Sequence, residues 1–317
     1  MRQLDRPPLV TVFGGGGFIG RQVCEALMRQ GARILIAQRN AVAAHVVQPL
    51  AQVGQLGYRQ ADLSNRTSVE LAVHGADMVI NLVGTFGAME TLHVEGARTV
   101  AEAAAAADCV SLVHVSAIGA DHQSPSRYGR TKAEGEDAVR AAFPGATIIR
   151  PSLVFGAEDQ LTNRFAGLGK LPIVPVLKPD AKFQPVYVVD LARAIATAAL
   201  EPASHGGKTY EIGGPQVMSM IELHRAIYAL SGQSPGLIEL PDFAGDILSR
   251  VGFLPGAPIT RDQWLMLGRD NVAAKGSKGL AAFGVESTPL AAVAGEWLAR
   301  FGGNRFAGRG TPQAASN

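Results

Sequence analysis

A run of glycines directly behind a short apolar segment restricts the possible folds of this chain most strongly. Residues 9–13 are followed by Gly14–Gly17 and then by Gly20, so that both the GxGxxG and the GxxGxxG spacings are present. Residues 18–30 have helical periodicity, with apolar side chains on one side. The predicted order is therefore strand, tight turn and helix, in which glycine lets the helix pack closely on the strand.

This context predicts a binding site for the pyrophosphate of a dinucleotide. Exposed amides and the helix dipole at the start of such a helix attract an anion. A merely flexible glycine turn is the alternative interpretation. The predicted cofactor contacts in this segment are Gly14, Gly17, Phe18, Ile19, Gly20 and Arg21.

Further apolar segments predict an α/β fold. We expect strands over residues 32–37, 77–83, 110–115 and 146–151 and before Asp62, and helices over residues 91–107 and 126–143. The strands are continuously apolar rather than alternating, which is typical of parallel sheets covered on both faces. Their alternation with helices predicts a doubly wound parallel sheet.

The pattern changes after Gly156, where four prolines interrupt the chain. We predict a dinucleotide-binding domain over residues 1–155, with return segments near 183–212, and a smaller, mostly helical lobe over residues 156–317 with a flexible tail from about residue 301. Helices are expected over residues 190–200, 218–230, 242–250, 260–268 and 289–300. Because ligands of doubly wound folds bind beyond the carboxyl ends of the strands, the second lobe is placed as a lid.

Composition and charge exclude several classes of protein. At 317 residues the chain can bury a core without disulfides or metals, so Cys24 and Cys109 are expected to be buried thiols. The histidines lack metal-ligand spacing, no apolar stretch reaches the length of a membrane span, and no helix carries a dense basic stripe for nucleic acid. The first residues do not resemble a targeting segment, so a cytoplasmic location is expected.

The basic residues gather toward the C-terminus, where residues 250–317 carry eight Lys or Arg and four Asp or Glu. The segment from Arg300 to Arg309 could meet an acidic partner or a membrane surface. A solvated tail without function is the alternative.

The end of the second strand indicates which dinucleotide binds. NAD sites usually place a carboxylate there, about 20 residues beyond the glycines, to bond the ribose hydroxyls. This chain has Ala37-Gln38-Arg39 instead, and a guanidinium can pair with a 2′-phosphate, which favours NADP(H), in particular NADPH, over NAD(H). An ordinary surface arginine is the alternative. Other predicted contacts lie at further strand ends: Asp62, Leu63, Val83, Gly84, Ser116 and Pro151. For Asp62, a helix N-cap is the alternative role.

Taken together, these motifs resemble the extended, atypical short-chain dehydrogenase/reductase superfamily. They are the glycine run, Asp62-Leu63, the NLVG segment ending at Gly84, Tyr128 and Lys132 as YxxxK, Arg150-Pro151 and Val188-Val-Asp190. The resemblance covers residues 9–215 and implies a Rossmann domain.

A narrower resemblance points to the nucleotide-binding accessory subunit family of respiratory complex I and its bacterial relatives. The segments that carry it are HVSAIGA at 114–120, residues 126–136, QPVYVVD at 184–190 and ITRD at 259–262. This resemblance implies a tightly held NADPH and attachment to the peripheral arm of complex I, on the cytoplasmic face of the inner membrane, in assembly and stability rather than turnover.

The superfamily resemblance also implies catalytic roles. There the tyrosine of YxxxK is the general acid/base, and the lysine one turn later lowers its pKa and bonds the nicotinamide ribose. Tyr128 and Lys132 have this spacing, so both can face one crevice. The third hydroxyl usually stands at the position of Ala117, whereas Ser116 lies one place earlier, where strand alternation could turn it away from a substrate. Cofactor binding without chemistry is the alternative role of the pair.

Three functions follow from these patterns. The first is a structural NADP(H)-binding protein of the complex I accessory type with little or no turnover. The second is an active NADP-dependent oxidoreductase or epimerase that uses Tyr128 and Lys132 on an unknown small substrate, such as a nucleotide-sugar or a quinone-related compound. The third is a redox sensor that reports NADP status, which shares the fold and has no sequence feature of its own.

Overall fold

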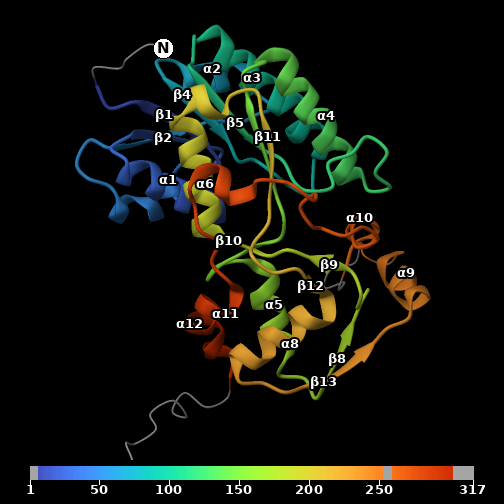
Figure 1. Ribbon diagram of the computed structural model, residues 1–317. Helices are drawn as coiled ribbons and strands as arrows, with labels where there is room; N and C mark the ends of the chain where they lie inside the picture. The colour runs from blue at the N-terminus through green and yellow to red at the C-terminus, as the bar shows by residue number, and fades with distance from the viewer. Residues whose placement is uncertain (1–5, 251, 253–258, 303–317) are drawn as a thin grey trace, which may run out of the picture.

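The computed structural model describes residues 6–250, 252 and 259–302. Within them, seven strands form one parallel sheet in the order β11-β6-β5-β4-β1-β2-β3. The strands are β1 (Leu9–Phe13), β2 (Arg33–Gln38), β3 (Leu56–Gln60), β4 (Met78–Asn81), β5 (Ser111–Val115), β6 (Thr147–Pro151) and β11 (Thr209–Ile212). The predicted doubly wound sheet is confirmed (Figure 1).

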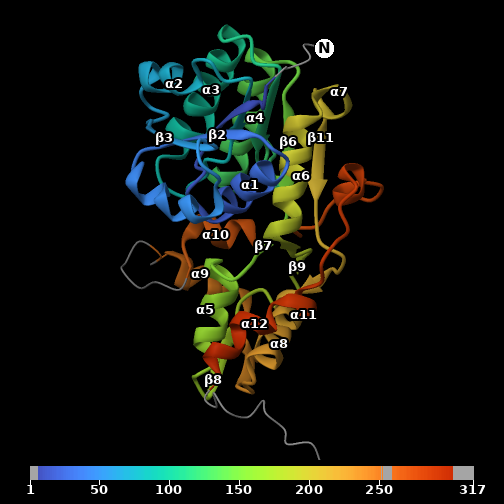
Figure 2. The same ribbon diagram turned by 90° about the vertical axis from the view of Figure 1, so that its left-hand side faces the viewer.

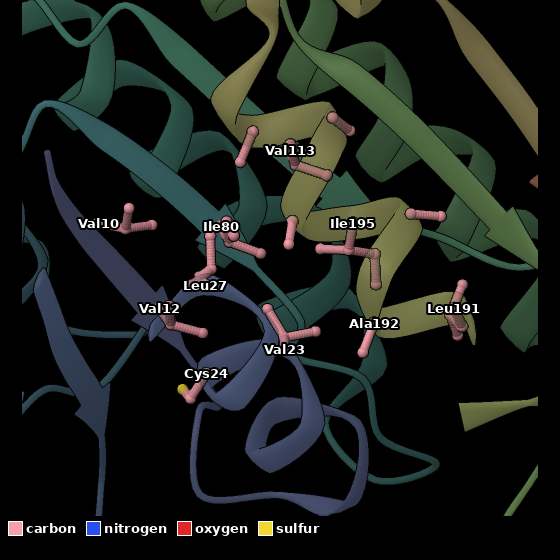
Figure 3. Packing of buried hydrophobic residues seen from close by; sticks show 14 of the residues in the cluster. Val10, Val12, Val23, Cys24, Leu27, Ile80, Val113, Leu191, Ala192 and Ile195 are labelled. Carbon is pink, nitrogen blue, oxygen red and sulfur yellow. The ribbon is translucent and has the colours of Figure 1, made fainter. Parts of the chain in front are cut away.

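Helices cover both faces of this sheet because its strands are apolar on both sides. One buried cluster joins Val10 and Ile80 of the sheet to α1 (Phe18–Arg29) and α6 (Val188–Leu200), and Figure 3 shows Val23, Leu27 and Ile195 of these helices pointing toward the strands. A second cluster lies beneath α2 (Arg66–Val73), α3 (Gly96–Ala106) and α4 (Arg127–Ala142) on the other face. Cys24 and Cys109 are buried, as expected.

The second lobe lies beyond one end of the sheet (Figure 2). Its helices are α5 (Gln160–Leu168), α8 (Met220–Ser231), α9 (Asp242–Arg250), α10 (Arg261–Met266), α11 (Leu290–Val293) and α12 (Gly295–Leu298), whereas α7 (Pro202–His205) lies beside β11 in the sheet domain. Short strands pair as β10 (Val186–Tyr187) with β7 (Val154–Phe155), β12 (Met218–Ser219) with β9 (Lys182–Phe183), and β13 (Gly236–Glu239) with β8 (Ile173–Val176). Packing of α5, α8 and the 290–301 segment around Phe155 forms its core.

Several elements differ from the expectations. The helix expected over residues 91–107 begins as a π-helix, Glu90–Glu95, and becomes α-helical only at Gly96. The segment 289–300 is broken into α11, α12 and a final 3₁₀ turn, Ala299–Phe301. The 3₁₀ helix Val42–Leu50 and helix α5 were not predicted, since neither segment has a clear apolar period.

The alternative role of Asp62, a helix N-cap, is not observed, and Asp190 does not cap α6 either. Helix α6 begins at Val188, and the buried carboxylate of Asp190 accepts the N–H of Thr288 at 2.7 Å instead of capping a helix. Asn65 rather than Asp62 caps α2, because its side chain accepts the N–H of Ser68 at 3.1 Å.

No helix in the described ranges is long and apolar enough to cross a membrane. Most of the predicted C-terminal tail, residues 303–317, lies outside the described residues.

The close approach of α1 to the glycine turn gives a test of the fold. A Cβ at Gly20 would lie 2.2 Å from the carbonyl oxygen of Gly14, so Gly20→Ala should lower the free energy of unfolding by about 3 kcal/mol through overpacking. Gly167→Ala in α5 is the matched control: a Cβ there meets nothing within 4 Å, and alanine should raise helix stability by up to about 1 kcal/mol. Equal changes in chemical denaturation of the two variants would contradict this packing.

Candidate functional site

The glycine turn places the start of α1 at the carboxyl ends of the strands. Gly14 has φ +80°, donates its N–H to Ala37 O at 3.0 Å and accepts the N–H of Gly17 at 3.0 Å. No side chain caps α1 at Gly17, and its first turn holds no acidic residue. The amides of a 12-residue helix therefore point at this position without a competing carboxylate, which suits the pyrophosphate of a dinucleotide.

Residues around this turn contact the second lobe and the neighbouring strand. A Cβ at Gly156 would lie 3.1 Å from the Phe18 ring, so Phe18 packs against the second lobe. Val83 lies beside Gly14, 3.6 Å from the position of a Cβ there. Arg21 forms an ion pair with Glu158, with Nη1 and Oε1 3.0 Å apart. The second lobe thus supplies Arg21 with a partner that the sequence did not indicate.

Gln38 and Arg39 take up different positions at the end of β2. The Oε1 atom of Gln38 accepts the N–H of Gly16 at 3.0 Å, and its Nε2 donates to Asn40 O at 2.6 Å. Arg39 is exposed and makes no hydrogen bond or ion pair with any described residue. The guanidinium beyond β2 is thus available to an anion, while Gln38 braces the glycine turn.

Asp62 and Leu63 are already engaged within the protein. The Oδ1 atom of Asp62 accepts the N–H and the hydroxyl of Ser64 at 2.9 and 2.7 Å. These hydrogen bonds, together with the charge of Arg39, lower the pKa of the Asp62 carboxyl. Leu63 is buried and packs against Gly96 at the start of α3.

Lys132, Gly84 and Ser116 meet at the ends of β4 and β5. The Nζ atom of Lys132 donates to Val115 O at 3.1 Å and lies 3.5 Å from the position of a Cβ at Gly84. Because Gly84 has no side chain, space beside the ammonium group stays open. The Ser116 hydroxyl is buried without a hydrogen-bond partner in the described part of the chain, so a polar group of a ligand would satisfy it.

Ser116 and Pro151 complete the strand ends. Ser116 donates its N–H to Ile149 O at 2.7 Å, so its pairing with β6 continues beyond β5. Because side chains alternate between the two faces of a strand, Ser116 points to the same face of the sheet as Leu112, which packs beneath α3 and α4. Pro151 ends β6, and its carbonyl accepts the N–H of Ile118 at 3.0 Å.

Tyr128 and Lys132 share one side of α4, and burial shifts the pKa of each. Burial raises the pKa of the Tyr128 phenol to about 12. Burial also lowers the pKa of the Lys132 ammonium to about 8, against a smaller raising effect of Glu136. Lys132 Nζ lies 5.8 Å from the centroid of the Tyr128 ring. Near pH 7 the pair is thus a neutral phenol and an ammonium group, which can donate hydrogen bonds.

The sequence did not single out His93, although it links the loop after β4 to α4. Its Nε2 accepts the N–H of Thr85 at 3.0 Å, and its Nδ1 lies 3.0 Å from Thr131 Oγ1, which in turn lies 3.2 Å from Tyr128 O. Because Nε2 accepts, Nδ1 carries the proton and donates. Burial, and then the charge of Lys132, lower the pKa of His93 to about 3, so the ring stays neutral. The π-helix that carries His93 is the type of irregularity often found at functional sites.

Two other residues at Tyr128 also escaped the sequence analysis as site residues. The exposed ring of Phe86 stacks on Tyr128 with centroids 4.9 Å apart. Asp262, in the ITRD segment, accepts the N–H of Tyr128 at 3.1 Å. Only the ITRD motif gave a signal, since Phe86 lies in a loop without a pattern. No cluster of three or more potential metal ligands occurs among the residues described.

Comparison with known proteins places these observations in a family context. Residues 10–213 match the NAD dependent epimerase/dehydratase family. The chain is 33% identical over 293 residues to NADH dehydrogenase (ubiquinone) 1 alpha subcomplex subunit 9, mitochondrial, of Rattus norvegicus, covering 89% of this chain and 77% of that protein. It is also 30% identical over 244 residues to the ceramide reductase of Caulobacter vibrioides, covering 75% of each chain.

Solved structures share the architecture. An NADPH-dependent quinone oxidoreductase from Escherichia coli, complexed with NADPH, aligns with a TM-score of 0.75 at 22% identity, covering 91% of this chain and 99% of that one. The Citrobacter sp. triphenylmethane reductase complexed with NADP(H) aligns with a TM-score of 0.73 at 20% identity, covering 92% and 99%. At these identities the likeness shows the fold alone, which is an NAD(P)-binding fold.

The neutral state of His93 predicts a pH dependence of stability. Its folded pKa of about 3 lies below the ordinary 6.5, so below pH 6.5 the unfolded chain takes up a proton that the folded chain does not. The contribution of the neutral His93 ring to the free energy of unfolding is fully present above pH 6.5 and declines as the pH falls toward 3.

His93→Gln keeps a donor and an acceptor but does not titrate. Between pH 7 and pH 5 this variant should therefore lose about 2 kcal/mol less unfolding free energy than the native protein. Urea denaturation at both pH values measures the difference, with the exposed His74→Gln as control. The prediction is wrong if both variants follow the native pH dependence.

Proposed function

Because this chain belongs to the NAD dependent epimerase/dehydratase family, we propose that it binds NADP(H), in the form of NADPH, as a structural ligand with little or no turnover. Its proposed partner is the peripheral arm of respiratory complex I, and its proposed place is the cytoplasmic face of the inner membrane, without insertion. The support for the partner is the 33% identity to a protein named as an alpha subcomplex subunit of NADH dehydrogenase.

The residues of the crevice fit a dinucleotide along its whole length. Gly14, Gly17, Phe18, Ile19 and Gly20 would hold the pyrophosphate at the uncapped start of α1. Gly84 leaves the space beside Lys132 into which a ribose would fit, and the unpartnered Ser116 hydroxyl would bond the nicotinamide end. The nicotinamide, when bound, supplies a hydride donor or acceptor.

The adenosine end favours NADP(H) over NAD(H) on the grounds of charge. Arg39 is exposed and unpaired within the described residues, so it would pair with a 2′-phosphate. Gln38 occupies the position of the usual carboxylate and already bonds the amide of Gly16. A 2′-phosphate would therefore meet the Arg39 guanidinium, while the Asp62 carboxylate, which feels the charge of Arg39, is bonded to Ser64. Asp62, Leu63, Val83 and Pro151 would border the cofactor, and Arg21, paired with Glu158, would lie near the phosphates.

The state of Tyr128 and Lys132 carries the proposal of little turnover. A general base needs a pKa near the working pH, whereas the pKa of Tyr128 is raised to about 12. The ammonium group that would lower it is bonded to Val115 O, and Phe86 stacks on the phenol ring. The pair is arranged to hold a ribose by hydrogen bonds more than to move a proton.

One observation favours the second candidate, an active NADP-dependent oxidoreductase. The chain is 30% identical over 244 residues to a protein named ceramide reductase, and Tyr128 and Lys132 are both present. Its substrate would be a carbonyl or hydroxyl compound that enters beside Phe86. An epimerase acting on a nucleotide-sugar would use the same pair.

The cofactor preference is tested by thermal unfolding with each dinucleotide. NADPH should raise the melting temperature more than NADH does, because only NADPH offers a 2′-phosphate to Arg39. Arg39→Ala should remove this difference, and Arg29→Ala, an exposed guanidinium at the far end of α1, should preserve it. Equal shifts for both dinucleotides in the native protein would contradict the assignment of Arg39.

Turnover is tested with Tyr128→Phe. Under the structural proposal, NADPH oxidation by native protein with carbonyl compounds stays at the background rate, and the variant, which lacks the hydroxyl that bonds the ribose, has an NADPH dissociation constant raised up to about tenfold. Native turnover that Tyr128→Phe abolishes would establish the second candidate instead.

Docking is tested in gently solubilised inner membranes. The protein should migrate with complex I subunits, and its removal should lower the amount of assembled complex. A protein that never co-migrates with these subunits would overturn the partner assignment while leaving nucleotide binding intact.

A further inference from the structure

The start of helix α4 is capped from the other lobe of the molecule. The first N–H groups of a helix have no partner within it. In α4 the Ser126 side chain accepts the N–H of Gly129 at 3.0 Å. The two preceding amides, those of Arg127 and Tyr128, donate to the two carboxylate oxygens of Asp262 at 2.5 and 3.1 Å.

Asp262 is itself held firmly in the second lobe. It lies in the first turn of α10, where Thr260 and Gln263 form a reciprocal capping box. The neighbouring Arg261 pairs with Asp246 of α9. The carboxylate therefore reaches α4 from an anchored turn, and it is separated by 134 residues from the tyrosine that it contacts.

Two further contacts join the same stretch of chain, which we name the strap (residues 259–271), to the sheet domain. Arg269 Nη1 lies 2.6 Å from Asp121 Oδ2, in the loop that leads into α4. Ser152, just beyond β6, donates its hydroxyl to Asn271 O at 2.7 Å. The strap thus touches the sheet domain around the start of α4, and its ITRD segment supplies the one carboxylate that accepts backbone N–H groups of that helix end in the described chain.

We propose that Asp262 is a positioning residue through which the strap fixes Tyr128 for the nucleotide. This inference rests on the proposed function, since it assumes that Tyr128 meets the nicotinamide ribose. The backbone of Tyr128 is held by Asp262 at its N–H and by Thr131 at its carbonyl, so the direction of its side chain depends on both. By linkage, a nucleotide that binds the fixed tyrosine must in turn stabilise the seated strap.

The proposal gives the second lobe a role beyond covering the crevice. A partner docked on the strap side of the molecule would alter nucleotide affinity without touching the cofactor. A bound nucleotide would likewise favour the seated strap that such a partner meets.

Asp262→Asn is the decisive substitution because it changes one acceptor oxygen into an NH₂ group that faces a backbone donor. Asp270→Asn is the matched control: Asp270 lies in the same strap and accepts the N–H of Lys182 at 3.0 Å, away from α4. Arg269→Gln loosens the strap while keeping Asp262, so it should have an intermediate effect. All three variants are made in the full chain.

Three quantities are measured: the NADPH dissociation constant, the melting temperature, and hydrogen exchange at the amides of Arg127 and Tyr128 with and without NADPH. Asp262→Asn should raise the dissociation constant about tenfold and speed exchange at both amides. NADPH should slow exchange across residues 259–271 in the native protein and not in this variant. Asp270→Asn should leave the dissociation constant within twofold, even if both variants lose thermal stability.

Each outcome decides a separate claim. If native protein binds NADPH and both Asp→Asn variants bind it equally well, Asp262 is only structural and the inference is overturned. If native protein does not bind NADPH, the proposed function fails. In that case hydrogen exchange at the amides of Arg127 and Tyr128 still tests the positioning role of Asp262. This role is overturned unless exchange at these amides is faster in Asp262→Asn and unchanged in Asp270→Asn.

Discussion

The site depends on a backbone contact, the approach of α1 to the glycine turn at Gly20. A side chain at Gly20 would overlap the carbonyl of Gly14, so the helix could not begin where it does with any larger residue. This contact places the uncapped start of α1 at the carboxyl end of the interior strand β1, which pairs with β2 on one side and β4 on the other. The anion site, the strand ends beside it and the lobe above them all take their positions from this arrangement.

The second constraint is electrostatic and concerns the site's polar groups. The crevice end of the sheet holds one buried ammonium, Lys132, and two neutral buried imidazoles, His93 and His114, whose pKa values are lowered to about 3 chiefly by burial. The neutral His93 ring provides fixed hydrogen-bond geometry through both of its nitrogens, and the Lys132 ammonium group provides a charge. The phenol of Tyr128, with its raised pKa, adds a donor rather than a base.

The sequence predicted those features that depend on local pattern. Continuous apolar strands, helical periodicity and glycine spacing were enough to predict the succession of strands and helices along the sheet domain. Each of these patterns reflects packing along one element and its neighbouring turn. The π-helix at Glu90–Glu95, the stacking of Phe86 on Tyr128 and the pairing of Arg21 with Glu158 depend on contacts between distant segments. A single sequence carries no pattern for such contacts. The carboxylate of Asp190 likewise bonds a distant segment at Thr288, whereas the alternative cap role of Asp62 is displaced by a local contact to Ser64.

The central claim is that the protein holds NADPH and keeps it. The most direct measurement is to purify the protein from its own cells, denature it, and identify and quantify the nucleotide released, before and after incubation with a small-molecule extract of those cells. We expect close to one equivalent of NADPH per chain in both samples. Release of NAD(H), the absence of nucleotide, or conversion of NADPH to NADP⁺ by the extract would contradict the central claim.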